Sequence, residues 1–342
     1  MTKQVDEQIK YKARDFASDQ EIRWCPGCGD YAILKQVQAA VAEIGVKKED
    51  IAFISGIGCS SRFPYYMETY GMHSIHGRAT AISSGLKAAR PELSVWIITG
   101  DGDSLSIGGN HLIHLLRRNF DTNILLFNNE IYGLTKGQYS PTSPEGKVSK
   151  SSPLGSIDHP FNPAALALGA DATFVARTID REPRHMKNIF LEAEQHKGAS
   201  FVEIYQNCIV FNDGAFSPYT ERGLKEEHLL FLEEGKPLLF NKDTKGVKLD
   251  GFTPVVVDME NASADDLMIH DPSDPMKAHI LSRIFDDPQK EHVLPRPFGV
   301  FYKADRATYE DALQDQIEHA IERSGKGDLD ALLRGNNTWV VE

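Results

Sequence analysis

The sequence has few cysteines, fewer basic than acidic residues and no long apolar run, and each shortage excludes a class of protein. Only 4 of its 342 residues are cysteine, too few for a disulfide-rich secreted domain. Lys and Arg number 37 against 49 Asp and Glu, and the formal net charge of −12 disfavours nucleic acid or an anionic membrane surface as the main partner. No apolar run approaches the roughly 18 residues that span a bilayer, and the charged amino-terminal stretch lacks the apolar core of a signal peptide. We therefore expect a cytoplasmic protein.

The four cysteines are unevenly spaced. Cys25 and Cys28 form a CxxC pair, whereas Cys59 and Cys208 stand alone. In a cytosolic protein a close CxxC is more often metal-binding or redox-active than a structural disulfide. Four thiolates are also the number that ligates a tetrahedral zinc ion or a [4Fe–4S] cluster. Spacing alone leaves a four-cysteine metal site and a redox pair with two inert cysteines equally open.

Hydrophobic patterns predict an alternation of strands and helices, which is typical of a doubly wound parallel α/β sheet. Continuous apolar runs predict buried strands, and periodic apolar residues predict helices. The predicted strands are 51–55, 95–99, 123–127 and 201–205, and the predicted helices are 30–45, 77–90, 110–118, 163–169 and 183–196.

The sequence changes in character after about residue 209. Prolines are scattered through the rest of the chain, and only one clear helix is predicted there, over 309–324. We expect residues 1–215 to form one domain and residues 216–342 to form a C-terminal extension that packs on this domain or on a partner.

Unusual short motifs follow the predicted strands. Gly56–Cys59, Gly100–Asp103, Asn128–Gly133 and Cys208 each come shortly after a strand. The carboxyl ends of parallel strands meet at one edge of a doubly wound sheet, where ligands bind. The sequence therefore predicts one site built from all four segments.

The pair Asp101 and Asn129 suggests a cation at this site. A carboxylate and an amide oxygen at the ends of neighbouring strands suit Mg²⁺, and the adjacent glycines allow a diphosphate to come close. The alternative is a tight glycine-rich turn with a solvated aspartate. The third glycine of GxGxxG and the GxxxxGK[ST] pattern are both missing, which disfavours a dinucleotide or a P-loop site.

Five motifs together resemble a known family. They are Trp24–Gly29, Gly56–Ser60, His76–Ala79, the GDGD…NN pattern from Gly100 to Asn129, and Ile131–Gln138. GDGD…NN looks like the thiamine diphosphate motif. The whole set resembles the beta subunit of 2-oxoacid:ferredoxin oxidoreductases, and most closely its 2-oxoglutarate (2-oxoglutarate synthase) branch. The resemblance covers roughly residues 15–215 and implies a sheet of the thiamine-diphosphate-binding type.

The resemblance also implies roles for individual residues, in four groups. A [4Fe–4S] cluster would be bound by Cys25, Cys28, Cys59 and Cys208. Mg²⁺ would be bound by the side chains of Asp101 and Asn129 and by the backbone carbonyl of Ile131. The diphosphate end of the cofactor would contact Gly102, Asp103, Gly133 and Leu134. The cofactor rings would lie near Ile57, Gly58, Cys59, Ser60, His76, Gly77, Arg78 and Ala79.

The implied reaction is the oxidative decarboxylation of 2-oxoglutarate to succinyl-CoA, or the reverse carboxylation. Thiamine diphosphate acts as the electron sink, coenzyme A takes the acyl group, and the cluster passes electrons to ferredoxin. Only 99 residues precede Gly100, which leaves no room for a second α/β domain. We therefore expect an alpha subunit to supply the pyrimidine-side domain with its glutamate, in a dimer of heterodimers.

Three residues are candidates for catalytic roles. Lys136 follows the predicted Mg²⁺ loop and would pair with the distal carboxylate of a dicarboxylic substrate, unless it is a solvated loop lysine. His76 is either an acid–base group or structural, and Arg78 either binds a carboxylate or braces its loop. The polar loop 136–160 is long enough to be a lid or a partner contact.

Three alternatives remain open at this stage. The same chemistry could act on pyruvate or on 2-oxoacids in general. A thiamine-dependent decarboxylase half could carry zinc at the cysteines. A non-catalytic, metal-stabilised scaffold would leave Asp101 and Asn129 without a purpose.

Overall fold

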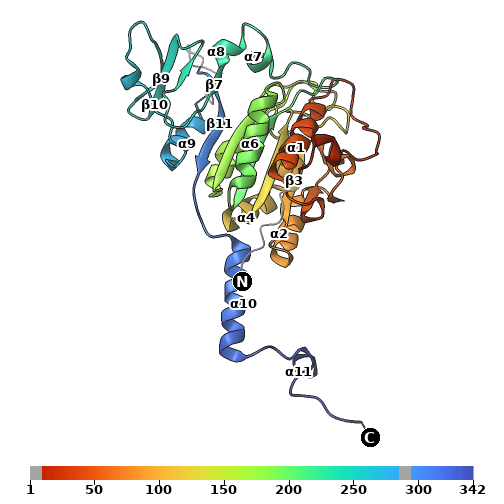
Figure 1. Ribbon diagram of the computed structural model, residues 1–342. Helices are drawn as coiled ribbons and strands as arrows, with labels where there is room; N and C mark the ends of the chain where they lie inside the picture. Colours follow the sequence, from red (N-terminus) through yellow and green to blue (C-terminus); the bar gives the residue numbers. More distant parts are fainter. Residues whose placement is uncertain (1–9, 285–293, 342) are drawn as a thin grey trace.

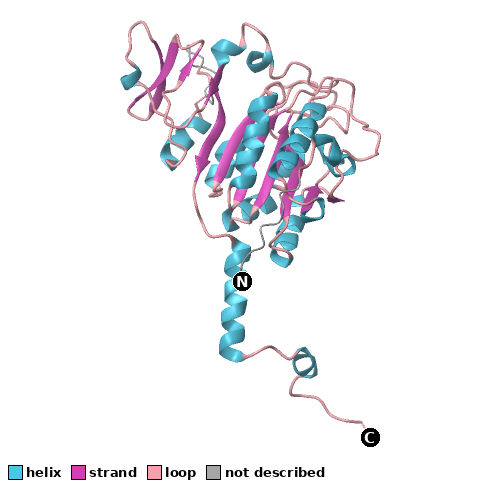
Figure 2. Cartoon of the chain, viewed as in Figure 1, coloured by secondary structure: helices cyan, strands magenta, loops and turns pink. Residues whose placement is uncertain are grey.

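The computed structural model describes residues 10–284 and 294–341 and contains one large sheet covered by helices on both faces (Figures 1 and 2). The sheet has eight strands in the order β2-β1-β3-β4-β6-β5-β11-β7, of which the first six run parallel. These strands are β1 Ile51–Ser55, β2 Tyr70–His73, β3 Ser94–Gly100, β4 Thr122–Asn128, β5 Phe174–Ile179, β6 Ala199–Tyr205, β7 Leu229–Phe231 and β11 Arg296–Lys303. The predicted doubly wound α/β fold is confirmed.

The central strands are mostly apolar because both of their faces are buried. Along β3, Val95 and Ile97 point into one apolar cluster, whereas Trp96 and Ile98 point into the other. Successive side chains of a strand alternate between faces, so a strand between two helical layers has no polar side. The helices covering the sheet are α1 Asp30–Ile44 and α6 Pro183–Gln195 on one face, and α2 Ala79–Ala89, α4 Gly109–Arg118 and α5 Pro163–Gly169 on the other.

The predicted elements of the first domain are confirmed with small shifts at their ends. Gly45 stops α1 in a left-handed conformation at φ 74°, as the sequence suggested. Helix α2 begins at Ala79 rather than at Gly77, because Gly77 lies in a turn at φ 63°. Asp101 opens a short helix, α3 Asp101–Leu105, where a turn was expected.

The sequence analysis missed β2 and β5. Strand β2 is an edge strand whose first three residues are exposed, so it has no apolar run to reveal it. Strand β5 contains Arg177 and Thr178, which are polar yet fully buried. A buried arginine in a strand is possible here because Arg177 Nε pairs with Glu203 Oε2 of the neighbouring β6 at 2.7 Å.

The helix predicted over 309–324 is confirmed as α10 Tyr309–Ser324, but the expectation that it is the one regular element after residue 209 is wrong. Strand β11 pairs antiparallel with β5, and β7 pairs parallel with β11, so this part of the chain completes the main sheet. A second sheet of three antiparallel strands stands beside it (Figure 1). The remaining elements are α7 Ser217–Thr220, α8 Lys225–His228, β8 Leu239–Phe240, β9 Lys245–Asp250, β10 Thr253–Asp258, α9 Pro275–Ser282, α10 Tyr309–Ser324 and α11 Leu329–Arg334.

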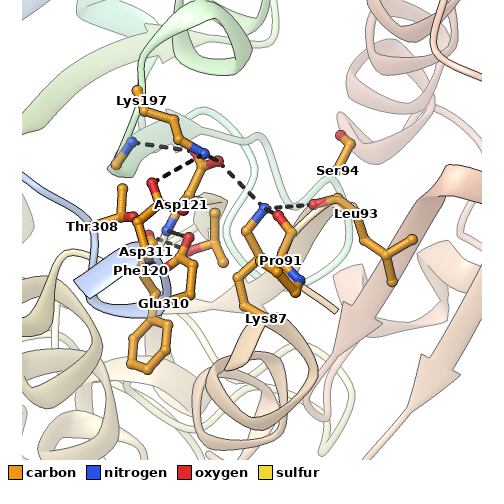
Figure 3. A network of polar contacts seen from close by, with 12 residues as sticks. Lys87, Pro91, Leu93, Ser94, Phe120, Asp121, Lys197, Thr308, Glu310 and Asp311 are labelled. Atoms are coloured by element: carbon orange, nitrogen blue, oxygen red, sulfur yellow. Dashed lines mark hydrogen bonds and ion pairs between the residues drawn. The ribbon is translucent and has the colours of Figure 1, made fainter. Parts of the chain in front are cut away.

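Helices α10 and α11 form an arm that projects away from the sheet (Figure 1). Polar contacts hold its root at the amino ends of the strands, on the opposite edge from the motifs (Figure 3). Glu310 accepts a hydrogen bond from the backbone N–H of Asp121 at 3.0 Å, and Asp121 pairs with Lys87 and Lys197. No helix within the two described ranges is long and apolar enough to cross a membrane.

Candidate functional site

A cavity of about 530 Å³ lies at the carboxyl ends of β1, β3 and β4. The loops after these three strands supply its walls, as the positions of the motifs predicted. Its lining residues are Ile57, Gly58, Cys59, Ser60, His76, Gly100, Asp101, Gly102, Asp103, Ser106, Ile107, Phe127, Asn129, Ile131, Tyr132, Gly133, Leu134, Thr135 and Gln138.

The Asp103 carboxylate holds the loops around the cavity together. Its Oδ1 atom accepts hydrogen bonds from the backbone N–H of Ile57 at 3.1 Å and of Gly77 at 2.7 Å. Its Oδ2 atom accepts one from the Thr99 hydroxyl at 2.9 Å. Both carboxylate oxygens are thus used within the protein, and any contact of Asp103 with an anion must come from its backbone N–H.

Glycines permit the close approach of these loops. A Cβ atom at Gly56 would lie 1.8 Å from Asp103 Oδ2, and one at Gly102 would lie 2.1 Å from a ring carbon of Tyr132. The Tyr132 hydroxyl also donates to the Gly102 carbonyl at 3.3 Å. The glycines of the GDGD motif and of the loop after β1 are therefore required by packing around the cavity.

Asp101 is the buried acid of the site. Its Oδ2 atom accepts hydrogen bonds from the hydroxyls of Ser140 at 2.5 Å and Thr142 at 2.6 Å. Burial raises the pKa of Asp101, and the two hydroxyls oppose that rise because they stabilise the carboxylate. Neither Ser140 nor Thr142 was assigned a role from the sequence. The feature that could have indicated one is the cluster of hydroxyl residues in Ser140–Ser143, which closely follows the motif Ile131–Gln138.

The predicted Mg²⁺ ligands come together at this cavity. Asn129 and Ile131 line it with Asp101, and the Ile131 N–H donates to Asn129 Oδ1 at 3.2 Å. Across the described residues, no three His, Cys, Asp or Glu side chains are grouped so that they could hold a metal ion. The predicted set needs no such group, since it consists of one carboxylate, one amide and one carbonyl, all oxygen donors that suit Mg²⁺. The residues present therefore fit the ion.

Cys59 and Cys208 lie next to the same cavity, although the four cysteines are not arranged as a metal-binding group anywhere in the described part of the chain. A Cβ atom at Gly133 would lie 3.6 Å from Cys59 Sγ and 3.5 Å from Cys208 Sγ, so these two thiols flank one residue of the cavity wall. Burial raises the pKa of Cys28 and raises that of Cys59 to about 12, and Asp30 and the neighbouring thiols add to both shifts. The raised pKa values favour the neutral thiols near neutral pH, and a bound cationic centre would be needed to favour the thiolates.

The three candidate catalytic residues have different surroundings. His76 is exposed and lines the cavity. Arg78 does not line it, and its Nη1 atom donates to the carbonyls of His76, Gly77 and Ile107 at 3.2–3.3 Å, which braces the loop. Lys136 does not line the cavity, although Thr135 and Gln138 on either side of it do; it is exposed and has a backbone φ of 75°.

Most predicted cofactor contacts reach the cavity, but three do not. Gly77, Arg78 and Ala79 lie outside its lining. The sequence analysis named the stretch from Ile131 to Gln138 without assigning Tyr132, Thr135 or Gln138, which do line the cavity. Two further lining residues, Ser106 and Ile107, follow α3 and had no signal in the sequence, because only the turn after α3 brings them there.

The long loop 136–160 is bound at its base and exposed at its tip. The Phe161 N–H donates to the Pro141 carbonyl, and the Gly146 N–H donates to the Ser156 carbonyl. At the tip, the side chains of Leu154 and Ile157 are 99% and 94% exposed.

Comparison with known proteins identifies the family. Residues 56–204 match the family described as thiamine pyrophosphate enzyme, C-terminal TPP binding domain. The chain is 52% identical over 336 residues to 2-oxoglutarate oxidoreductase subunit KorB of Mycobacterium tuberculosis, and the alignment covers 97% of this chain and 89% of that protein. The chain belongs to the beta subunits of the 2-oxoacid:ferredoxin oxidoreductases, in their 2-oxoglutarate branch.

Other members of the family agree with this assignment. The chain is 44% identical over 185 residues to 2-oxoglutarate synthase subunit KorB of Archaeoglobus fulgidus, covering 54% of this chain and 69% of that protein. It is similar along nearly its whole length to a solved 2-oxoglutarate:ferredoxin oxidoreductase from Magnetococcus marinus with 2-oxoglutarate, coenzyme A and succinyl-CoA bound. That likeness has a TM-score of 0.75 at 32% identity and covers 97% of this chain and 98% of the other. The scaffold alternative does not explain these matches.

Proposed function

We propose that this chain is the beta subunit of a 2-oxoglutarate:ferredoxin oxidoreductase, which converts 2-oxoglutarate and coenzyme A to succinyl-CoA and passes electrons to ferredoxin. The same site would serve the reverse carboxylation. The observation that carries the proposal is the position of Gly133, whose neighbours are the thiols of Cys59 and Cys208 on one side and the cavity with Asp101 and Asn129 on the other. A diphosphate site and a cluster site that share a wall suit a reaction that must remove electrons from a bound cofactor.

Residues of the first loops would hold thiamine diphosphate. Asp101, Asn129 and the Ile131 carbonyl would bind Mg²⁺, and the backbone of Gly102 and Asp103 at the start of α3 would face the diphosphate with Gly133 and Leu134. Thiamine diphosphate supplies the electron sink for decarboxylation. Ile57, Gly58, Ser60 and His76 would orient its rings, while Gly77, Arg78 and Ala79 would act from behind by shaping the loop.

Cys25, Cys28, Cys59 and Cys208 would ligate the [4Fe–4S] cluster. Gln206 donates from Nε2 to Cys28 Sγ at 3.3 Å, and Trp24 donates from Nε1 to the Cys59 carbonyl at 2.7 Å, so both segments are held in place by neighbouring side chains. A hydrogen bond to sulfur, such as that of Gln206, stabilises charge on a ligating thiolate. Cys59 lines the cavity as well, so it would lie between the two cofactor sites.

A partner subunit would complete the active site. Ile75, Ile107 and Leu134, near or at the cavity, are 63%, 57% and 49% exposed, and the loop tip adds Leu154 and Ile157. We place the alpha subunit with its pyrimidine-side domain against this apolar rim. The arm formed by α10 and α11 would contact a partner chain too, in a dimer of heterodimers in the cytoplasm.

Lys136 would select the substrate. Its ammonium group would pair with the distal carboxylate of 2-oxoglutarate, which pyruvate lacks. His76 would donate a hydrogen bond or a proton to the substrate, because it is the one histidine among the residues that line the cavity.

Anaerobic copurification of this chain with the alpha subunit tests the function. We expect a brown complex that contains iron, sulfide and thiamine diphosphate and that reduces viologen with 2-oxoglutarate and coenzyme A. Zinc in a colourless protein would contradict the cluster, and faster reduction with pyruvate would contradict only the role of Lys136. A complex without thiamine diphosphate would overturn the proposal.

A further inference from the structure

Three hydroxyl side chains lie under the cavity floor without belonging to its lining. Ser140, Thr142 and Ser143 are 2–5% exposed, although they belong to a long polar loop. Buried hydroxyls require hydrogen-bond partners, and those of Ser140 and Thr142 both reach Oδ2 of Asp101. Distances of 2.5 and 2.6 Å are typical of hydroxyls that donate to a charged carboxylate.

The geometry of these two bonds fixes the orientation of the carboxylate. Two donors that converge on one oxygen prevent the group from rotating about the bond to its Cβ atom. Neither hydroxyl bonds to Oδ1, so the two side chains leave that face of the carboxylate to the backbone around Gly102 and to a cation. Asp101 sits 39 and 41 positions before its two partners, so this arrangement exists only in the folded loop.

The same hydroxyls are tied to the loop that carries the other proposed ligands. Ser143 Oγ accepts a hydrogen bond from the Ser140 N–H at 2.8 Å and donates to the Glu130 carbonyl at 2.6 Å. Glu130 stands between Asn129 and Ile131 in the chain. The three hydroxyl side chains therefore connect the proposed ligand after β3, Asp101, to the segment Asn129–Ile131 after β4.

Thr142 also lies close to the sheet. Its Oγ1 atom lies 2.9 Å from Asn128 Oδ1, and Asn128 Nδ2 donates to Glu203 Oε1 at 2.8 Å. The hydroxyl has one proton, and the shorter bond at 2.6 Å gives it to Asp101, so Asn128 Oδ1 is a close neighbour and not a second acceptor. Glu203 is fixed by its ion pair with Arg177, in which both side chains are fully buried, so the sheet fixes the place of Asn128 beside Thr142.

We propose that Ser140, Thr142 and Ser143, which we call the hydroxyl bracket, are positioning residues for the divalent cation. They set the distance and orientation between Asp101 and the segment Asn129–Ile131, so that the ligands from the two loops are already arranged when the cation and the diphosphate bind. The proposal rests on the proposed function, since it assumes that Asp101 and Asn129 are the ligands.

The test measures cation affinity directly in the complex with the alpha subunit. Mn²⁺ replaces Mg²⁺, and free Mn²⁺ is followed by its EPR signal at saturating thiamine diphosphate. Thr142→Val keeps the shape of the side chain and removes the hydroxyl, so we expect the Kd for Mn²⁺ to rise about 10-fold or more. Thr142→Ser restores a hydroxyl and should stay within about 3-fold of the wild type, and kcat of Thr142→Val should recover at saturating cation.

Thr173→Val is the matched control. Thr173 is 3% exposed, against 5% for Thr142, and its hydroxyl contacts Asn119 and His196 at the opposite edge of the sheet. The variant Thr173→Val should lower the melting temperature about as much as Thr142→Val does and leave the Kd for Mn²⁺ unchanged. If Thr142→Val does not fold, Ser140→Ala carries the test, with an expected rise in Kd of several fold.

Three results separate the possible outcomes. A higher Kd for Mn²⁺ in Thr142→Val but not in the control Thr173→Val, with a nearly normal Kd in Thr142→Ser, supports the bracket. An unchanged Kd in a folded Thr142→Val or Ser140→Ala complex overturns the bracket but leaves the proposed function intact. A wild-type complex that binds no Mn²⁺ with thiamine diphosphate overturns the proposed function, and the bracket with it.

Discussion

At the scale of single residues, the cavity depends on the absence of a Cβ atom at certain glycines as much as on the side chains around it. Gly56 and Gly102 have no Cβ atom where Asp103 and the Tyr132 ring would collide with one. The sequence shows glycine at both positions. The atoms that would collide with a Cβ atom belong to residues 47 and 30 positions further along the chain, so they are known only from the structure. The exclusion of side chains therefore explains why the motif has glycine at these places.

Gly102→Ala tests this reading. The added methyl group must displace the Tyr132 ring, so we expect a loss of roughly 1–3 kcal/mol in stability and poor retention of thiamine diphosphate. Gly109→Ala is the control, because no atom lies within 4 Å of a Cβ atom there and its φ is not in the left-handed region. Thermal melting and a thiochrome assay of bound cofactor measure both effects. Equal cofactor content in the two variants would contradict the argument.

Lys136→Gly tests the substrate role without disturbing the fold. Lys136 has a φ of 75°, a conformation that glycine adopts without strain, so the melting temperature should stay unchanged or rise slightly. Loss of the ammonium group should lower kcat/KM for 2-oxoglutarate by about 10-fold or more and leave that for pyruvate nearly constant. Equal losses for both substrates would show that Lys136 does not recognise the distal carboxylate.

At the scale of secondary structure, the root of the arm shows how burial decides the contribution of an ion pair. Asp121, just before β4, pairs through Oδ2 with Lys87 of α2 at 3.3 Å and with Lys197 at 2.7 Å (Figure 3). The Lys87 side chain is only 3% exposed, whereas that of Lys197 is 58% exposed. Lys87 also donates to the carbonyls of Pro91 and Leu93 at 2.8 and 2.7 Å, so it connects α2 to the start of β3.

The two lysines offer a matched pair of substitutions. Lys87→Met would leave two carbonyls without their donor and Asp121 without its buried partner, and should cost about 2–4 kcal/mol of stability. Lys197→Met removes an exposed partner of the same carboxylate and should cost less than about 1 kcal/mol. Thermal or urea unfolding measures both variants. A larger loss in Lys197→Met would contradict the weight given to burial.

At the scale of the whole molecule, the eight-stranded sheet with its covering helices, which we call the body, and the arm differ in how they are stabilised. The eight-stranded sheet buries its apolar residues on both faces, but Leu332, Leu333 and Trp339 of the arm are 78%, 75% and 83% exposed. A helix whose apolar face packs against nothing is only marginally stable, because most helical stability in proteins comes from packing of that face. The body therefore folds around its own core, and the arm is suited to a contact with another chain.

Substitutions in the arm test this contact. Leu332→Asp with Leu333→Asp should weaken the assembly by at least about 10-fold in dissociation constant while the melting temperature of the isolated chain changes little, since both residues are mostly exposed to solvent. Asn336→Ala with Asn337→Ala is the polar control in the same segment and should change neither property. Mass photometry at decreasing concentration measures the assembly. Unchanged masses in the leucine variant would place the contact elsewhere.

The sequence by itself determined most elements of residues 30–205 and the residue types available at the site. Apolar runs reveal strands that are buried on both faces, and residue types such as those of Gly100–Asp103 and Cys25–Cys28 restrict the ligands that they can bind. These signals are local, so they are present in the one-dimensional pattern. The Mg²⁺ and cluster assignments remain predictions.

Only the tertiary structure decided how distant segments complete the fold and the site. Strand β11 pairs with β5 more than a hundred positions earlier, and no local pattern specifies a partner at that distance. Ser140 and Thr142 read as ordinary loop residues until the loop folds back onto Asp101. Pairing and burial are properties of the whole chain, because a polar side chain acquires its role from the groups that packing places beside it.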